Sequence, residues 1–179
     1  ILFLGRLTKD KGVIDLISAF KEIMSKKLDC YLLLVGPDED HIVKNYLKTE
    51  EYKSKVLSFE YTDTPEYYMQ ISDFICLPSL REGFGNVVLE AAMCQVPAVV
   101  SDIYGLKDVI EKNSTALTFP PGNTEELKNS LLTLINSPEK INTMGENAIK
   151  RANYLFSSGS VNDSLVKFYQ ELVIYNSKV

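Results

Sequence analysis

The runs Tyr31-Leu32-Leu33-Leu34-Val35 and Phe74-Ile75-Cys76-Leu77 decide the fold of this chain. Both are apolar at every position, without the alternation that marks a strand with one face in water. Continuous apolar strands are buried on both faces, as in a parallel sheet that is covered by helices. The two runs therefore predict a parallel sheet with helices on both sides.

Short runs of this kind alternate with helix-length amphipathic stretches along the chain. We expect six strands, at residues 1–5, 30–36, 55–59, 74–77, 98–101 and 116–119. We expect helices at residues 12–25, 38–49, 65–71, 86–94, 107–111 and 124–136. This strand–helix repetition predicts an α/β fold, a Rossmann-like doubly wound parallel sheet.

The strand pattern ends at residue 136, and two further helices are expected, at 138–156 and 161–175, with Ser157-Ser158-Gly159 between them. A chain of 179 residues has the size of one domain. We therefore interpret residues 1–179 as a single domain, with an α/β core at 1–136 and a helical tail at 137–179. Because the chain opens inside a strand, without an initiator Met, we expect it to be part of a longer protein.

Composition excludes several classes of protein. Nineteen basic and 24 acidic residues give 19 − 24 = −5, which argues against a nucleic-acid partner. No apolar run approaches the ~20 residues of a membrane span. The three cysteines lie in apolar stretches, as reduced thiols of a cytoplasmic protein do. We predict no metal and no resident cofactor, and we interpret the single histidine, His41, as a surface helix residue.

Ligands of an open α/β sheet bind at the loops that leave the carboxyl ends of its strands. In the first such loop Gly5 closes the strand, and Arg6 and Lys11 precede a helix. Cations beside free N–H groups make an anion site, although solvated surface charges are the alternative. In the second loop Gly36 ends the strand, and we interpret Pro37-Asp38 as a plain turn and helix cap.

The third loop and its helix, residues 77–94, are the most informative. Gly83 and Gly85 let the backbone approach a ligand and adopt positive φ. Glu90 lies in a helix that is apolar on every side, so we expect it to be a buried carboxylate that faces the crevice and accepts from ligand hydroxyls. The alternatives are a structural bond to the backbone or Arg6 for Glu90, and a solvated acid for Glu82.

The fourth loop carries Tyr104, whose ring and hydroxyl suit contact with a sugar. Ordinary loop packing is the alternative for this side chain. Taken together, the four loops predict a nucleotide-phosphate binder that has paired acids for the recognition of hydroxyl groups.

In this order the motifs resemble the group 1, or family 4 type, retaining glycosyltransferases, which consist of two Rossmann-like domains (the GT-B fold). The resemblance covers nearly the whole chain and falls on the C-terminal, donor-binding domain of that family. It rests on Gly5-Arg6-Leu7 with Lys11-Gly12, Val35-Gly36-Pro37, Pro78-Ser79, and Glu82-Gly83-Phe84-Gly85 with Glu90 at the Glu-x7-Glu spacing.

The resemblance implies roles for these residues. Arg6 and Lys11 would clamp the donor diphosphate, and N–H groups around Gly85-Asn86-Val87 would meet phosphate and sugar. Glu90 would take the ribose hydroxyls, and Glu82 would face hydroxyls of the transferred sugar. With Arg6, Lys11 and Glu82 as catalytic residues, the substrate-binding set is Gly5, Gly36, Gly83, Phe84, Gly85, Asn86, Val87, Glu90 and Tyr104.

The implied enzyme is a hexosyltransferase-type glycosyltransferase of cell-surface polysaccharide synthesis. It would move a sugar from a nucleotide diphosphate sugar, with a UDP-sugar as first candidate, to a glycan or lipid-linked acceptor, without a metal. It would work in the cytoplasm, with peripheral association of the full-length enzyme at the inner face of the membrane. The N-terminal, acceptor-binding domain would lie outside this chain, so we expect the 179 residues alone to be inactive. The alternatives are a nucleotide-sugar epimerase or glycan phosphorylase of the same architecture, and a non-catalytic nucleotide-binding module.

Overall fold

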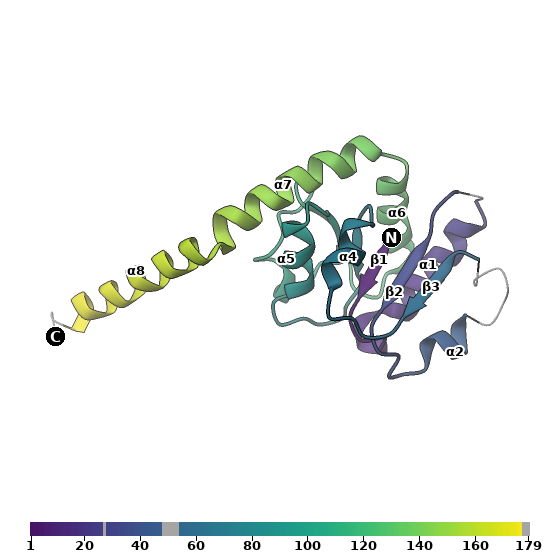
Figure 1. Ribbon diagram of the computed structural model, residues 1–179, viewed down its shortest axis with the longest axis horizontal. Helices are drawn as coiled ribbons and strands as arrows, with labels where there is room; N and C mark the ends of the chain where they lie inside the picture. Colours follow the sequence, from purple (N-terminus) through teal and green to yellow (C-terminus); the bar gives the residue numbers. More distant parts are fainter. Residues whose placement is uncertain (27, 48–53, 177–179) are drawn as a thin grey trace.

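The computed structural model describes residues 1–26, 28–47 and 54–176, with side chains up to residue 173 (Figure 1). Its strands form one parallel sheet in the order β3-β2-β1-β4-β5-β6. They are β1 (Leu2–Leu4), β2 (Leu32–Val35), β3 (Val56–Phe59), β4 (Ile75–Leu77), β5 (Ala98–Ser101) and β6 (Ala116–Phe119). The predicted fold class and all six predicted strands are confirmed.

The chain order reverses between β1 and β4, which are neighbours at the centre of the sheet with Leu2 opposite Ile75. A reversal of this kind separates the loops that follow the two strands and opens a crevice at their carboxyl ends. The continuous apolar runs occupy the middle of the sheet, as predicted. Most of their side chains are fully buried, among them Leu32, Leu34, Ile75 and Cys76.

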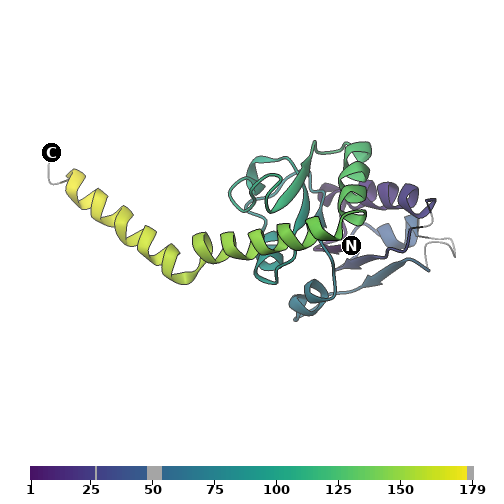
Figure 2. The same cartoon turned by 90° about the horizontal axis from the view of Figure 1, so that it is seen from above.

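Helices cover both faces of the sheet. On one face α1 (Val13–Met24) packs along α6 (Thr124–Ile135), and on the other α5 (Asn86–Met93) contacts α4 (Pro65–Gln70) and α7 (Pro138–Phe156). Figure 2 shows the strands between these two layers. The helices expected at 12–25, 65–71, 86–94 and 124–136 are confirmed to within a residue or so at each end.

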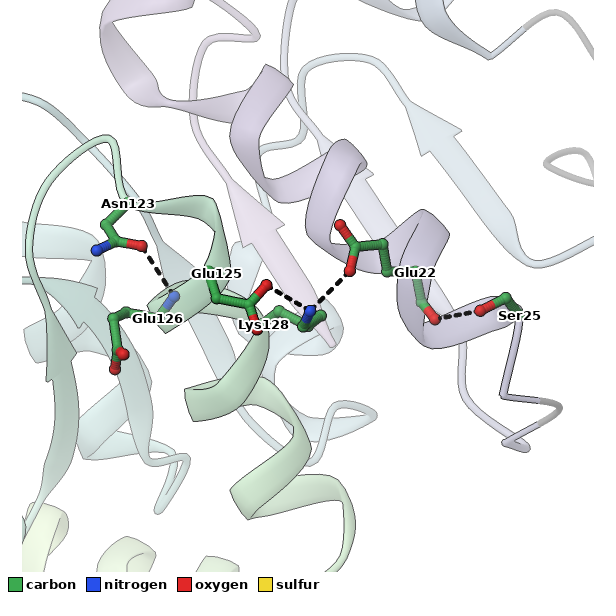
Figure 3. A network of polar contacts seen from close by, with 6 residues as sticks. All are labelled: Glu22, Ser25, Asn123, Glu125, Glu126 and Lys128. Atoms are coloured by element: carbon green, nitrogen blue, oxygen red, sulfur yellow. Dashed lines mark hydrogen bonds and ion pairs between the residues drawn. The ribbon is translucent and has the colours of Figure 1, made fainter.

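A polar cluster joins α1 to α6 at the rim of their packed face (Figure 3). The Lys128 ammonium lies 2.7 Å from a carboxylate oxygen of Glu22 on α1 and 2.5 Å from one of Glu125 on α6. The side chain of Lys128 is only 13% exposed. Asn123 caps α6 by accepting a 3.0 Å hydrogen bond from the Glu126 N–H, which satisfies an orphan donor of the first turn.

Two helices predicted in the α/β core differ from those observed. The helix expected at 38–49 is the shorter α2 (Ile42–Tyr46), because the Asp38 carboxylate accepts from the N–H groups of Ile42 and Val43 and so caps the helix from outside. His41 is exposed but precedes this helix, with φ of 53°. Residues 48 and 49 of the predicted range lie outside the described residues.

The helix predicted at 107–111 was wrong. A 3-10 turn, η2 (Tyr104–Leu106), precedes this range, and residues 107–109 form hydrogen-bonded turns and no helix. The Arg151 side chain of α7 donates to the carbonyl oxygens of Asp108 and Val109, at 2.9 and 3.4 Å. These carbonyls therefore bond to a neighbouring element and not to a following helical turn.

The tail consists of α7 and α8 (Ser158–Asn176). Helix α7 packs on α5 through Ala92, Ala148 and Ala152, whereas α8 projects away from the body (Figures 1 and 2). The break between them is Ser157 alone, because its hydroxyl accepts from the Ser160 N–H and begins α8 earlier than predicted. Within the described residues, no helix is long and apolar enough to cross a membrane.

Candidate functional site

A hollow of about 450 Å³ opens at the carboxyl edge of the sheet, where β1 and β4 end. It is lined by Leu4, Gly5, Lys11, Leu77, Glu82, Gly83, Phe84, Gly85, Asn86, Val87 and Glu90. Most of the predicted site residues are therefore together. Another hollow, of about 530 Å³ around Ile1 at the opposite edge, contains none of them.

Two loops that are far apart in the sequence touch beside this hollow. The Leu80 N–H donates to the Asp10 carbonyl at 2.9 Å. A Cβ at Gly12, where φ is +68°, would lie 2.0 Å from the Pro78 carbonyl oxygen. Only glycine permits this approach, and Lys11 is thereby held against the third loop.

Lys11 and Glu82 form an ion pair in the wall of the hollow. Lys11 Nζ lies 2.7 Å from Glu82 Oε1, and the two side chains are 18% and 13% exposed. The Ser79 hydroxyl donates to the same oxygen, also at 2.7 Å. Glu82 is thus a held, partly buried carboxylate, and the alternative of a solvated loop acid is wrong.

The first turn of α5 faces the same hollow. Gly85 precedes this helix with φ of +73° and offers no side chain to cap it. Asn86 and Val87 line the hollow, and in the described part of the chain nothing accepts from their backbone N–H groups. Uncapped N–H groups and the positive end of the helix dipole make an anion site.

Glu90 lines the hollow, but the prediction that it is buried was wrong: it is exposed. Helix α5 buries only the face that carries Val88, Ala91 and Ala92, which packs on the core and α7, while Met93 is 49% exposed. The apolar residues on all sides of α5 therefore did not mean that every side is covered: the side that carries Glu90 lies at the open hollow.

Arg6 stands outside the hollow in this structure. Its guanidinium pairs with Glu39 at 3.1 Å, with side chains 55% and 46% exposed. The alternative in which Glu90 bonds to Arg6 is therefore not what the structure shows. Gly36 is also outside the hollow, but next to it, since the Gly5 N–H donates to the Val35 carbonyl at 2.9 Å.

Tyr104 and Phe84 are placed differently from each other. Tyr104 is 86% exposed and does not line the hollow, although its neighbour Gly105 lies against the Glu82 carbonyl. Phe84 lines the hollow and packs edge-on against Phe156 of α7, with ring centroids 5.6 Å apart. Phe84 therefore connects the third loop to the end of α7.

The pKa values of Asp10 and of the three cysteines, none of which lines the hollow, are also shifted. The Thr8 hydroxyl, 2.6 Å from Asp10, lowers the pKa of that carboxyl. Cys30, Cys76 and Cys94 are all free, and burial raises the pKa of each thiol. Over residues 1–26, 28–47 and 54–176, no three His, Cys, Asp or Glu side chains are grouped so as to hold a metal ion.

Comparison with known proteins agrees with this architecture. The chain is 32% identical over 170 residues to the capsular polysaccharide biosynthesis glycosyltransferase CapM of Staphylococcus aureus, covering 93% of this chain and 44% of that protein. It is 27% identical to an alpha-D-kanosaminyltransferase of Streptomyces kanamyceticus, covering 96% of this chain and 45% of that protein. The chain thus spans less than half the length of these relatives.

Solved structures share the fold. A glycosyltransferase from Rickettsia africae superposes with a TM-score of 0.85 at 23% identity, over 96% of this chain and 47% of that one. Anabaena HepE, solved in complex with UDP, has a TM-score of 0.79 at 24% identity, over 95% of this chain and 48% of that one. At these identities the likeness is one of fold, the Rossmann-like half of a GT-B protein.

The family itself follows from the sequence. The model of the family "Glycosyl transferases group 1" matches residues 1–151, which is most of the chain. The chain belongs to this family of glycosyltransferases.

Proposed function

We propose that this chain is the C-terminal, donor-binding domain of a retaining, hexosyltransferase-type enzyme that uses a nucleotide diphosphate sugar. The observation that carries the proposal is the meeting of a cation, two carboxylates and an uncapped helix start at one hollow, represented by Lys11, Glu82, Glu90 and the first turn of α5. The cation and the uncapped helix start can bind a diphosphate, and the two carboxylates can accept hydrogen bonds from sugar hydroxyls.

The phosphate end of the site is proposed to consist of Lys11 and the N–H groups of Asn86 and Val87. A lysine ammonium has three N–H donors, so Lys11 can keep its bond to Glu82 and donate to a phosphate oxygen as well. These groups would stabilise the charge that develops on the leaving nucleotide when the sugar is transferred. No step in this scheme requires a metal.

Arg6 joins the phosphate end only if it leaves Glu39. An exposed ion pair contributes only about 0–1 kcal/mol. The Arg6–Glu39 pair is half exposed on both sides, so little free energy holds the guanidinium against Glu39. A guanidinium can also contact two phosphate oxygens at once. We therefore keep Arg6 in the proposed diphosphate clamp.

The two carboxylates are proposed to divide the hydroxyl groups of the donor. Glu90, exposed at the hollow four residues into α5, would accept from the ribose hydroxyls, and Glu82, held beside Lys11, from the transferred sugar. Gly83 fits this arrangement, because the space where its Cβ would stand is empty to 4 Å. Phe84 would close one side of the hollow, and Tyr104 would approach the sugar only after a movement of its loop.

We further propose that the acceptor is a glycan or a lipid-linked sugar of cell-surface polysaccharide synthesis, held by a domain outside these 179 residues. The similarity to a capsular polysaccharide enzyme supports this class of acceptor. We place the full-length enzyme in the cytoplasm, with peripheral association at the inner face of the membrane.

A thermal-shift screen tests the proposal. UDP-glucose, GDP-mannose and ADP-glucose, each with its free nucleoside diphosphate, are added to the 179-residue chain. We expect one nucleotide series, with UDP as the first candidate, to raise the melting temperature by mass action. If none of the three series produces a shift, and calorimetry detects no binding, the donor-binding role is wrong.

A further inference from the structure

Ser79, two residues beyond the end of β4, has a fully buried side chain, and its hydroxyl is hydrogen-bonded to Glu82, a residue that lines the hollow. Its hydroxyl donates to Glu82 Oε1 at 2.7 Å, and Lys11 Nζ reaches the same oxygen at 2.7 Å. Both bonds fall on Oε1. In the described part of the chain no group donates to Glu82 Oε2, so this oxygen is the one left for a ligand.

Two donors on one oxygen fix the carboxylate in a way that a single ion pair does not. The lysine ammonium ends a long flexible side chain, and its three donors can turn. The serine side chain is short, lies two residues beyond the end of β4 and is sealed from solvent. A short buried donor restricts the rotation of the carboxylate more than the flexible ammonium does, whereas Lys11 supplies the opposite charge.

The hydrogen bond from Ser79 to Glu82 is not explained by a requirement that every buried serine hydroxyl at this edge be paired. Ser101 ends the adjacent strand β5 at the same edge of the sheet, is equally buried, and its hydroxyl has no partner. The sheet thus tolerates a buried serine hydroxyl without a partner at this edge. The Ser79 hydroxyl has a partner because Glu82 is beside it.

We propose that Ser79 is a positioning residue for recognition of the transferred sugar: with Lys11 it holds Oε1 of Glu82 and so presents Oε2 to the sugar hydroxyls in the hollow. The proposal rests on the function proposed above. It predicts that Ser79 affects the sugar part of the donor and not the nucleotide part, since the phosphate groups face Lys11 and the start of α5.

The test compares Ser79→Ala with Ser101→Ala, which also removes one buried serine hydroxyl from the carboxyl end of a neighbouring central strand. Isothermal calorimetry on the 179-residue chain gives the dissociation constants of UDP and UDP-glucose, and of the GDP-mannose and ADP-glucose pairs. We expect Ser79→Ala to weaken nucleotide-sugar binding about tenfold and to change nucleoside diphosphate binding less than about twofold. We expect Ser101→Ala to change neither.

Each other result overturns the inference in a recognisable way. An equal loss for nucleotide and nucleotide sugar would mean that Ser79 supports the loop as a whole. An equal effect of Ser101→Ala would mean that any lost buried hydroxyl suffices. If the wild-type chain binds each nucleotide sugar no more tightly than the matching nucleotide, the role proposed for Oε2 is wrong, although the nucleotide site stands. A wild-type chain that binds none of the ligands would overturn the proposed function itself.

Discussion

Lys11 and Glu82 are 71 positions apart in the sequence, yet their charged groups lie 2.7 Å apart in the wall of the hollow. One belongs to the loop after β1 and the other to the loop after β4, the two strands at which the order of the sheet reverses. The pair therefore ties the two loops together across the crevice. The pair also joins the two proposed ends of the site, since Lys11 belongs to the phosphate end and Glu82 to the sugar end.

Arg6→Ala tests whether the guanidinium leaves Glu39 for the diphosphate. We expect the variant to weaken UDP binding roughly 10–100-fold, since it removes charge-assisted bonds of ~1.5–3 kcal/mol each. Calorimetric titration gives the affinity. Lys9→Ala is the matched control, because Lys9 is an exposed cation of the same loop and its removal changes the net charge equally. Equal losses in the two variants would indicate only a long-range charge effect.

Glu90→Ala tests the proposed contact with ribose. The side chain is exposed, so we expect the melting temperature to stay within about 2 °C of the wild type. We expect the wild type to bind UDP more tightly than its 2′-deoxy analogue, and the variant to lose most of this preference. Glu139→Ala, at an exposed position near the start of α7, controls for the lost charge. A preference that survives in Glu90→Ala would assign ribose recognition to other groups.

The sequence predicted the sheet well because the signal was local. A continuous apolar run, such as the one that ends at Val35, indicates a strand buried on both faces, and it can be recognised without knowing which elements pack against it. The helix expected at 107–111 failed for the opposite reason. Its carbonyls bond to Arg151, a residue more than 40 positions away, and no local pattern reports such a contact.

In the candidate site, too, some features could be predicted from the sequence and others depend on contacts between distant residues. The loops that meet at the hollow followed from topology, so Lys11, Glu82 and the start of α5 could be expected together. The pairing of Arg6 with Glu39, the exposure of Glu90 and the bond from Ser79 to Glu82 could not. Each depends on which face of a helix or loop is covered by another element, and the pattern of residue types does not contain that information.

Two glycines of the site loops should respond in opposite ways to alanine. A Cβ at Gly105 would lie 1.9 Å from the Glu82 carbonyl oxygen, a backbone atom that cannot turn aside, whereas a Cβ at Gly83 would meet nothing within 4 Å. We expect Gly105→Ala to lower the free energy of unfolding by about 1–3 kcal/mol through overpacking, and Gly83→Ala to leave it nearly unchanged. Urea denaturation measures both.

Nucleotide-sugar binding separates the two glycines further. If the open space beside Gly83 is used by the donor, Gly83→Ala should weaken binding although the protein stays as stable as the wild type. Full affinity in a stable Gly83→Ala variant would show that the donor does not approach this part of the backbone.

The Lys128 cluster predicts how stability depends on alkaline pH. Hydrogen bonds to Glu125 and Glu22 raise the pKa of Lys128 above 10.5. A group whose pKa is higher in the folded state stabilises the fold fully below its unfolded pKa, and this contribution is lost as the pH rises through the folded pKa. We expect Lys128→Met to be less stable than the wild type at pH 8, with a difference that shrinks above pH ~10.5.

Lys150→Met is the control for that comparison, because Lys150 is an exposed lysine whose carboxylate partner is 3.9 Å away on the same helix. Urea unfolding of the three proteins at several values between pH ~8 and ~11.5 provides the data. A Lys128→Met deficit that stays constant across this range would assign the effect to lost packing of the lysine stem and not to its charge.

Sugar transfer is the property that we expect the 179 residues to lack. If the acceptor is held by a further domain, the chain can bind a donor but cannot place an acceptor hydroxyl next to its anomeric carbon. Positioning of two reactants contributes up to ~7–11 kcal/mol of barrier reduction, and this chain would forgo nearly all of it. We therefore expect calorimetry to detect donor binding while radiolabelled UDP-sugars, incubated with extracted lipid acceptors, give no labelled product. A full-length protein that contains this chain, assayed with the same acceptors, is the positive control. Robust transfer by the 179 residues alone would mean that both substrates bind within this one domain, and the assignment of the acceptor to another domain would be wrong.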